Sequence, residues 1–216
     1  MATGLPMYFT GGQGSLVSYN SIDIITGTGY ITLYGGDSNA GTRSLSNMTF
    51  YSDIPNSNSC NTGTVAYTKG GDYDFDVLCN KPMTLQGKAI INVPFCFDGG
   101  LGDNAYIITR VRKYNGAETE LGLSTASQTI ASSNVGPVGD ITCTSCAIPL
   151  TGFKKGEYIR ITVEVWANRP GGGGSAGLWI FYDPMGRTTY NGIPVTIPTN
   201  MQTTQMKVLL PVRIDL

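Results

Sequence analysis

The sequence predicts an all-β protein, an antiparallel β-sandwich of jelly-roll-like type with about ten strands. Two observations carry this prediction. In many segments apolar side chains recur at every second position, which places them on one face of an extended strand, whereas the spacing of an amphipathic helix is hard to find. Between these segments lie clusters of Gly, Asn, Pro and Ser, which favour turns, and the 216 residues include 29 glycines.

The chain is expected to form one domain. Its length suffices for one large β domain or two small ones, and its hydrophobic fraction of 41% can supply a core. The sequence has no convincing boundary and no internal repeat. We therefore expect a single sandwich over residues 27–216, preceded by a flexible or extended arm over residues 1–26, which is rich in glycine.

Four strands are predicted in the first half of the chain. Weaker patterns over Gly29–Gly36 and Met48–Asp53 come first. The segment Tyr73–Cys79 then alternates apolar residues with aspartates. In Lys88–Asp98 the apolar residues at every second position share a face, and Pro94 indicates an edge or a bulge because proline has no amide hydrogen to donate.

The segment Asn104–Gly122 is predicted to form a β-hairpin. Asn115-Gly116 lies between two extended runs and is the preferred pair for a two-residue type I′ turn. That turn would place Lys113 opposite Glu118. Neither face of the first strand is cleanly apolar or polar, since Tyr106, Ile108, Arg110 and Arg112 share one face and Ile107, Val111 and Lys113 share the other. We expect Arg110 or Arg112 to make polar contacts, either with the core or with a neighbouring chain.

The second half of the chain continues the two-residue pattern. The predicted strands are Ile141–Leu150, Gly156–Trp166, Leu178–Tyr182 and Lys207–Leu216. In Gly156–Trp166 four aliphatic residues face inward, and the polar residues and Trp166 face outward. The segment Asn168–Gly177 contains four successive glycines, so we expect a flexible loop there.

Composition argues against several functions. Charged residues make up 13% of the chain, about half the roughly 25% that is usual. The net charge is −1, and no basic run is present to drive binding to nucleic acid or to a membrane surface. No segment approaches the roughly 18 consecutive apolar residues of a spanning helix. The first residues lack the pattern of a signal peptide, so we expect synthesis in a host cytoplasm.

We expect no catalytic residues and no cofactor, and therefore a protein that is not an enzyme. The chain contains no histidine, which removes Ser-His-Asp and Cys-His systems and imidazole metal sites. A glycosidase would need only two carboxylates. The candidate pairs are Asp74 with Asp76, Glu118 with Glu120, and Asp98 with Asp103. The first two pairs lie on outward strand faces, which is common on ordinary surface strands.

Two segments resemble metal sites. Asp98, Asp103 and Asn104 offer oxygen ligands for calcium in a glycine-rich loop, but Asp and Asn in such loops usually bond their own backbone, and we favour that turn. Cys143 and Cys146 form a lone CxxC motif without the second pair or histidines of a zinc site. Local packing or an opportunistic disulfide remains for these cysteines, and no metal is predicted.

Two tryptophans are further candidates for contact with other molecules. Trp166 and Trp179, with Tyr182, could form a stacking platform for sugars, but we favour the core or a subunit contact. The predicted interface residues are therefore Arg110, Arg112, Trp166 and Trp179.

Several segments together resemble the capsid-associated decoration or auxiliary head proteins of tailed bacteriophages, which are jelly rolls. These segments are TGYITLYGG, YDFDVLCNKPMTLQGKAIINVPF, NAYIITRVRKYNGAETELG, TGFKKGEYIRITVEVW, YDPMGR and TTQMKVLLPVRIDL, and they span most of the chain from residue 27 onward. These segments are typical of strands and turns, and none of them contains a catalytic motif.

The resemblance implies a virion protein on the outer capsid surface that stabilises the head. Its partners would be the major capsid protein and copies of itself, as a homo-oligomer. The alternative is a phage tail or fibre module of the same fold that binds a host glycan.

Overall fold

The structure is a computed structural model that describes residues 17–18, 28–38, 42–47, 57–62, 65–100, 102–132, 137–171, 176–182, 189–190, 193–196 and 205–213. Its strands are β1 (Val17–Ser18), β2 (Thr28–Ser38), β3 (Thr42–Ser46), β4 (Ser57–Thr62), β5 (Thr68–Leu78), β6 (Met83–Asp98), β7 (Asn104–Tyr114), β8 (Glu118–Leu123), β9 (Ile130–Ala131), β10 (Val138–Phe153), β11 (Tyr158–Asn168), β12 (Ala176–Phe181), β13 (Thr189–Tyr190), β14 (Ile193–Thr196) and β15 (Lys207–Arg213). These ranges contain no helix, and hence no helical segment of membrane-spanning length and apolarity.

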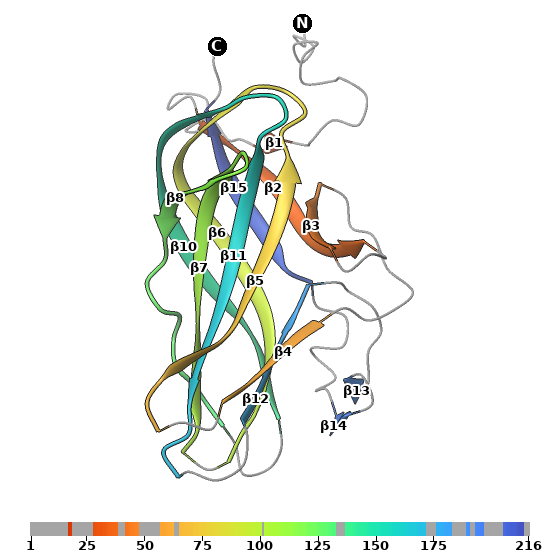
Figure 1. The fold of residues 1–216 in the computed structure, drawn as a ribbon, viewed down its shortest axis with the longest axis vertical. Coiled ribbons are helices and arrows are strands. Elements are labelled where there is room, and N and C mark those ends of the chain that lie inside the picture. The colour runs from red at the N-terminus through yellow and green to blue at the C-terminus, as the bar shows by residue number, and fades with distance from the viewer. Residues whose placement is uncertain are drawn as a thin grey trace, which may run out of the picture.

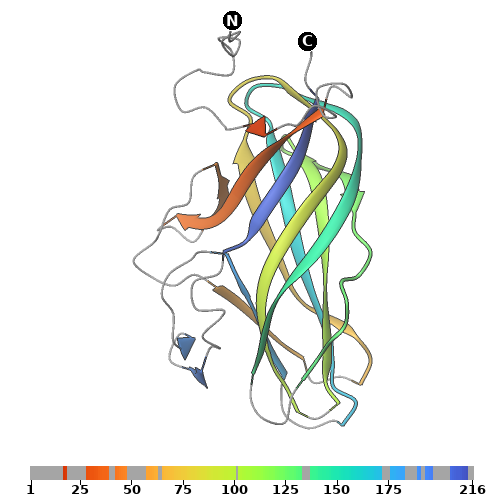
Figure 2. The ribbon, with the colours of Figure 1, turned by 180° about the vertical axis from the view of Figure 1, so that it is seen from behind.

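The strands pack as two layers, which confirms the predicted antiparallel β-sandwich (Figure 1). Thirteen strands form one hydrogen-bonded sheet that folds over on itself, in the order β4-β12-β6-β15-β2-β3-β5-β11-β7-β8, with β10 on the other edge of β6. One layer holds β10, β6, β15 and β2, and the other holds β5, β11, β7 and β8 (Figure 2). β3 joins the layers, and its contact with β5 is the one parallel pairing among the described strands.

The core lies between the layers, where the alternating side chains of both sheets meet. The predicted inward residues of β6, β11 and β15 are all buried: Ile91, Val93, Phe95, Phe97, Ile159, Ile161, Val163, Val165, Val208, Leu210 and Val212. β5 contributes Phe75, and β7 contributes Ile107 and Val111, each with no exposed surface. Apolar burial of this extent supplies the main driving force for folding.

Two prolines occupy irregular places in the sheet, as expected of residues that cannot donate a hydrogen bond. β15 pairs with β6 up to Asn92, and β12 pairs with β6 from Phe95 onward, so Pro94 lies between the two pairings. Pro211 lies where the register of β15 against β6 shifts, and it faces Gly87, whose φ is +124°. The prediction that Pro94 marks an irregular position is consistent with this arrangement.

The β7–β8 hairpin is confirmed, but its predicted turn and register are wrong. Tyr114 pairs with Glu118, so the connection has three residues, with Gly116 at a φ of +101°. A change of one residue in register moves a side chain to the opposite face. Lys113 therefore contacts Glu157, with 2.7 Å between Nζ and Oε2, and does not contact Glu118.

Several predictions fall wholly or partly outside the described residues. These include the strand over Met48–Asp53, most of the arm over residues 1–26, residues 172–175 of the Asn168–Gly177 loop and the last three residues of the chain. Of the arm, Val17 and Ser18 form β1 and pair with β2.

Candidate functional site: the charged face

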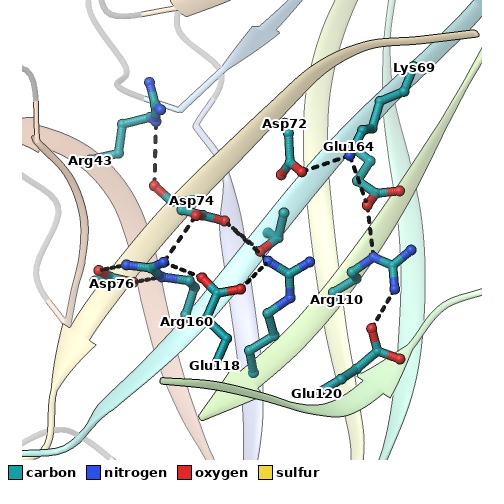
Figure 3. Close-up of polar contacts among 12 residues, drawn as sticks. Arg43, Lys69, Asp72, Asp74, Asp76, Arg110, Glu118, Glu120, Arg160 and Glu164 are labelled. Carbon is teal, nitrogen blue, oxygen red and sulfur yellow. Dashed lines mark hydrogen bonds and ion pairs between the residues drawn. The ribbon is translucent and has the colours of Figure 1, made fainter. Parts of the chain in front are cut away.

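The densest cluster of polar side chains lies on the outer surface of β5, β11, β7 and β8 (Figure 3). We call this surface the charged face. It holds six carboxylates and four cations: Asp72, Asp74, Asp76, Glu118, Glu120, Glu164, Lys69, Arg110, Arg112 and Arg160. On β5, β11 and β7 most of these residues alternate with buried residues, so the two-residue period of the sequence places them together, whereas Lys69 joins them after a register shift between β5 and β11.

Arg160 is the centre of one half of the charged face. Its Nε and Nη2 donate to the two carboxylate oxygens of Asp76 at 2.7 and 2.8 Å, and its Nη1 binds Asp74 and Glu118. The guanidinium lies 4.4 Å from the centroid of the Tyr114 ring. The hydrogen bond to Asp76 raises the pKa of Arg160 above its ordinary value, although partial burial opposes the rise. The bidentate geometry fixes this arginine in one orientation.

Glu164 is the centre of the other half. Its side chain is 4% exposed and accepts hydrogen bonds from Arg110 Nε at 2.8 Å and from Trp166 Nε1 at 3.1 Å. Lys69 Nζ lies 3.7 Å away. Burial by itself would raise the pKa of Glu164, but the contacts with Arg110, Trp166 and Lys69 lower it overall. Glu164 therefore stays ionised, and the hydrogen bond to Glu164 raises the pKa of Arg110.

An aromatic cluster adjoins Glu164. Trp166 and Tyr106 are cross-strand neighbours with ring centroids 6.0 Å apart and nearly parallel planes, and Tyr67 contacts Tyr106 at 4.9 Å. Trp166 is on the outward face, as predicted from the sequence. Trp179 is different: it is only 4% exposed on β12, where both faces of the strand are buried, so it is not an exposed platform within this chain.

Arg110 and Arg112 make the polar contacts that the sequence predicts. Arg110 binds Glu164 and Glu120, and Arg112 binds Glu118 at 3.1 Å. Both sets of contacts are within the chain, so a role in an interface stays a prediction. The sequence reasoning did not single out Glu164 or Arg160, although both follow from the outward positions of β11.

The carboxylate pairs that the sequence singled out do not form an isolated acid pair. Asp74 and Asp76 contact Arg160, and Glu118 contacts both Arg112 and Arg160. Each of these carboxylates is therefore bound to an arginine, and none of them faces a second carboxylate across an open cleft among the contacts described.

The loop that contains Asp98, Asp103 and Asn104 has the contacts of a turn. Asp103 is buried, accepts a hydrogen bond from the amide of Gly100 at 2.8 Å and lies 3.5 Å from Arg169. Asn104 donates to the carbonyl of Gly102. Among the described residues no group of three or more acidic or cysteine side chains is arranged to hold a metal ion.

A cavity of about 240 Å³ lies between the segment that contains β9 and strand β10. It is lined by Phe95, Gln128, Thr129, Ile130, Ala131, Val138, Asp140, Ile141 and Thr142. Asp140 is the one titratable residue in this lining, so the cavity does not supply an acid–base pair.

The four cysteines whose side chains the structure describes, Cys79, Cys96, Cys143 and Cys146, are free thiols. Cys143 is exposed on β10 and Cys146 is buried on the opposite face of the same strand, because residues three apart in a strand point to opposite sides. The two do not pair. Burial raises the pKa of Cys79 to about 11 and that of Cys96 to about 12, and it also raises the pKa of Cys146.

We expect Cys143 to react with a thiol reagent far faster than Cys79, Cys96 and Cys146, because the reactive species is the exposed thiolate. Mass spectrometry after brief alkylation near pH 8 would measure the order of labelling. A Cys143→Ser variant should lose the rapid label at this strand. Equal labelling rates at all four positions would contradict the described burial.

No protein-family model matches the chain, and no curated protein matches it in sequence. Its fold is similar to those of three solved hydrolases. An alpha-amino acid ester hydrolase aligns with a TM-score of 0.56 and 10% identity over 84% of this chain and 36% of its own. An aminopeptidase from a marine sediment archaeon, Thaumarchaeota archaeon, gives 0.54 and 8% over 85% and 36%. A CocE/NonD family hydrolase from Staphylococcus aureus gives 0.50 and 12% over 87% and 37%.

These matches contradict the expectation that the protein is not an enzyme, because these three solved structures are hydrolases. At 8–12% identity the likeness shows the fold alone, and the chain spans just over a third of the length of each hydrolase. A structure of infectious bursal disease virus also aligns, over 87% of this chain and 37% of its own at 9% identity, but its TM-score of 0.29 carries no argument. By its fold, the protein is therefore classed as a β-sandwich.

Proposed function

We propose that the chain is a protein-contact module of a viral particle, which binds the outer shell as a decoration protein and associates with copies of itself. The observation that carries this proposal is the charged face. Its side chains are held in place by contacts within the chain, so little conformational entropy is lost when a partner covers them. The segments that resemble phage decoration proteins support the viral setting.

The test is binding of the purified protein to empty shells of the virus from which the sequence comes. We expect co-sedimentation with the shells and density for the protein on their outer surface in electron micrographs. A protein that leaves the shells unlabelled at saturating concentration would contradict the proposal.

A second candidate is an accessory β-sandwich of a hydrolase, favoured by the match of the fold to about a third of each of the three hydrolases. In this case the chain would pack against a catalytic domain. The mass of the native protein and its turnover of an amino-acid ester would test this. A native mass of 23.0 kDa with no ester hydrolysis would contradict it.

A further inference from the structure

The two outer surfaces of the sandwich carry opposite charge. The charged face has six carboxylates against four cations, which leaves a net charge of −2. Apart from the buried Glu164, its carboxylates are 24–45% exposed, whereas its three arginines are 16–24% exposed and Lys69 is its one cation with 40% exposure. A neighbouring molecule would therefore meet mainly negative charge on this side.

The opposite surface is formed by β10, β6, β15 and β2 (Figure 2), and we call it the back face. Its outward residues alternate with buried ones and lie in rows across the strands. One row holds Cys143, Asn92, Lys207 and Tyr34, the next holds Ser145, Ile90, Leu209 and Thr32, and a third holds Ala147 and Lys88. The described residues of these rows include two lysines and no carboxylate.

The two lysines of the back face have no ion-pair partner within the described part of the chain, in contrast to the cations of the charged face. Lys88 is exposed and Lys207 is partly exposed, and Ile90 and Leu209 lie between them. Asp98 is outward on the same strand, but it is ten residues beyond Lys88, roughly 33 Å along an extended chain. The centre of the back face is therefore positive and partly apolar.

We propose that copies of this chain associate by packing the back face of one copy on the charged face of the next. This inference rests on the self-association in the proposed function and names the surfaces that carry it. Lys88 and Lys207 would meet the exposed carboxylates, and Ile90 and Leu209 would be covered. Because two unlike faces meet, the contact is heterologous, and it repeats into rows or closes into a ring. Two identical faces would repel each other.

The size of the contact sets its strength. Four strands and about six residues along each cover roughly 20 Å by 20 Å, or about 400 Å² per copy. A stable interface of standard size buries about 800 Å² per partner. A single contact is therefore weak and depends on protein concentration, and many contacts in a repeating assembly add avidity.

Charge-reversed variants test this proposal by sedimentation velocity over a series of protein concentrations. The back-face variant carries Lys88→Glu and Lys207→Glu, and the charged-face variant carries Asp72→Lys and Glu120→Lys. Each should associate at least about tenfold more weakly than the unmodified chain, because its two faces no longer differ in sign. An equimolar mixture of the two variants should recover a complex, since each supplies the face that the other lacks.

The matched control changes the same charges away from both faces. Lys81 and Lys155 are exposed and lie in connections between strands, so Lys81→Glu with Lys155→Glu should leave association unchanged. Association of the unmodified chain should weaken between about 0.02 M and about 0.3 M salt, as screening increases. Labelling of Cys143, which lies in the same row of the back face as Lys207, should slow as the protein concentration rises.

Three outcomes overturn the inference: an unmodified chain that stays monomeric, variants that associate as the unmodified chain does, or a mixture that stays monomeric. Binding to shells is measured separately with the same variants. Association without shell binding contradicts the proposed role on the shell, but it is compatible with the contact between the back face and the charged face. Shell binding by a chain that is monomeric in solution at every concentration contradicts self-association through the two faces and leaves the shell-binding part of the proposed function standing.

Discussion

Replacement of Glu164 by alanine is expected to destabilise the protein by about 3 kcal/mol, since removing one partner of a buried ion pair leaves the other charge uncompensated. The carboxylate is 4% exposed and receives hydrogen bonds from Arg110 and Trp166. Without it, Glu120, which is exposed, is the one ion-pair partner of Arg110 left among the described residues, and the indole N–H of Trp166 loses its acceptor. Urea unfolding followed by tryptophan fluorescence would measure the change.

Glu120→Ala is the matched control, because Glu120 binds the same arginine but its side chain is 45% exposed. Exposed ion pairs contribute at most about 1 kcal/mol, so this variant should be close to the unmodified protein in stability. If Glu164→Ala and Glu120→Ala cost the same free energy, burial would not be the reason for the importance of Glu164.

The contribution of Glu164 should also depend on pH. Its pKa in the folded protein lies below the ordinary value of 4.5, so the folded state favours the ionised form. The resulting stability is fully present above the unfolded pKa and is lost as the pH falls through the folded pKa. The difference in free energy of unfolding between the unmodified protein and Glu164→Gln should thus be constant near neutral pH and shrink below about pH 4.5. A difference that grows on acidification would contradict the lowered pKa.

The strands with a two-residue apolar pattern were predictable from the sequence. β6, β11 and β15 were placed with the correct inward faces because burial on one side imposes the alternation. The hairpin register was not predictable, because Asn115-Gly116 fits a two-residue turn as well as the observed three-residue connection. The order of strands in the sheet was also not predictable, since it depends on contacts between segments that are distant in the sequence.

The sequence predicts which side chains make up the charged face, but it does not predict how far each of them is buried. The sequence shows that Glu164 points outward on β11, yet its burial arises because β11 lies between β5 and β7, whose long side chains cover it. For Trp179 the sequence pattern itself indicates burial. The run Leu178–Tyr182 is apolar at every position, which is typical of a strand buried on both faces, and all of these residues are buried.

Gly122, which follows the register shift between β7 and β8, lies against the opposite layer. A Cβ atom added there would lie 2.5 Å from the carbonyl oxygen of Ala147 on β10 and 3.2 Å from Cβ of Cys146. Both obstacles belong to the opposite layer, and a backbone oxygen cannot rotate aside as a side chain can. The absence of a side chain at this position therefore allows β8 to approach β10 and close the sandwich.

Gly122→Ala is accordingly expected to destabilise the protein by about 3 kcal/mol, at the upper end of the usual cost of overpacking. For a chain of this size the melting temperature should fall by roughly 6–12 °C, which calorimetry would measure. Gly152→Ala on β10 is the matched control, because a Cβ there meets no atom within 4 Å. It should leave the melting temperature nearly unchanged, within about 2 °C. If Gly122→Ala and Gly152→Ala had the same melting temperature, β8 and β10 could move apart to admit the methyl group. The close contact between these strands would then not limit the packing.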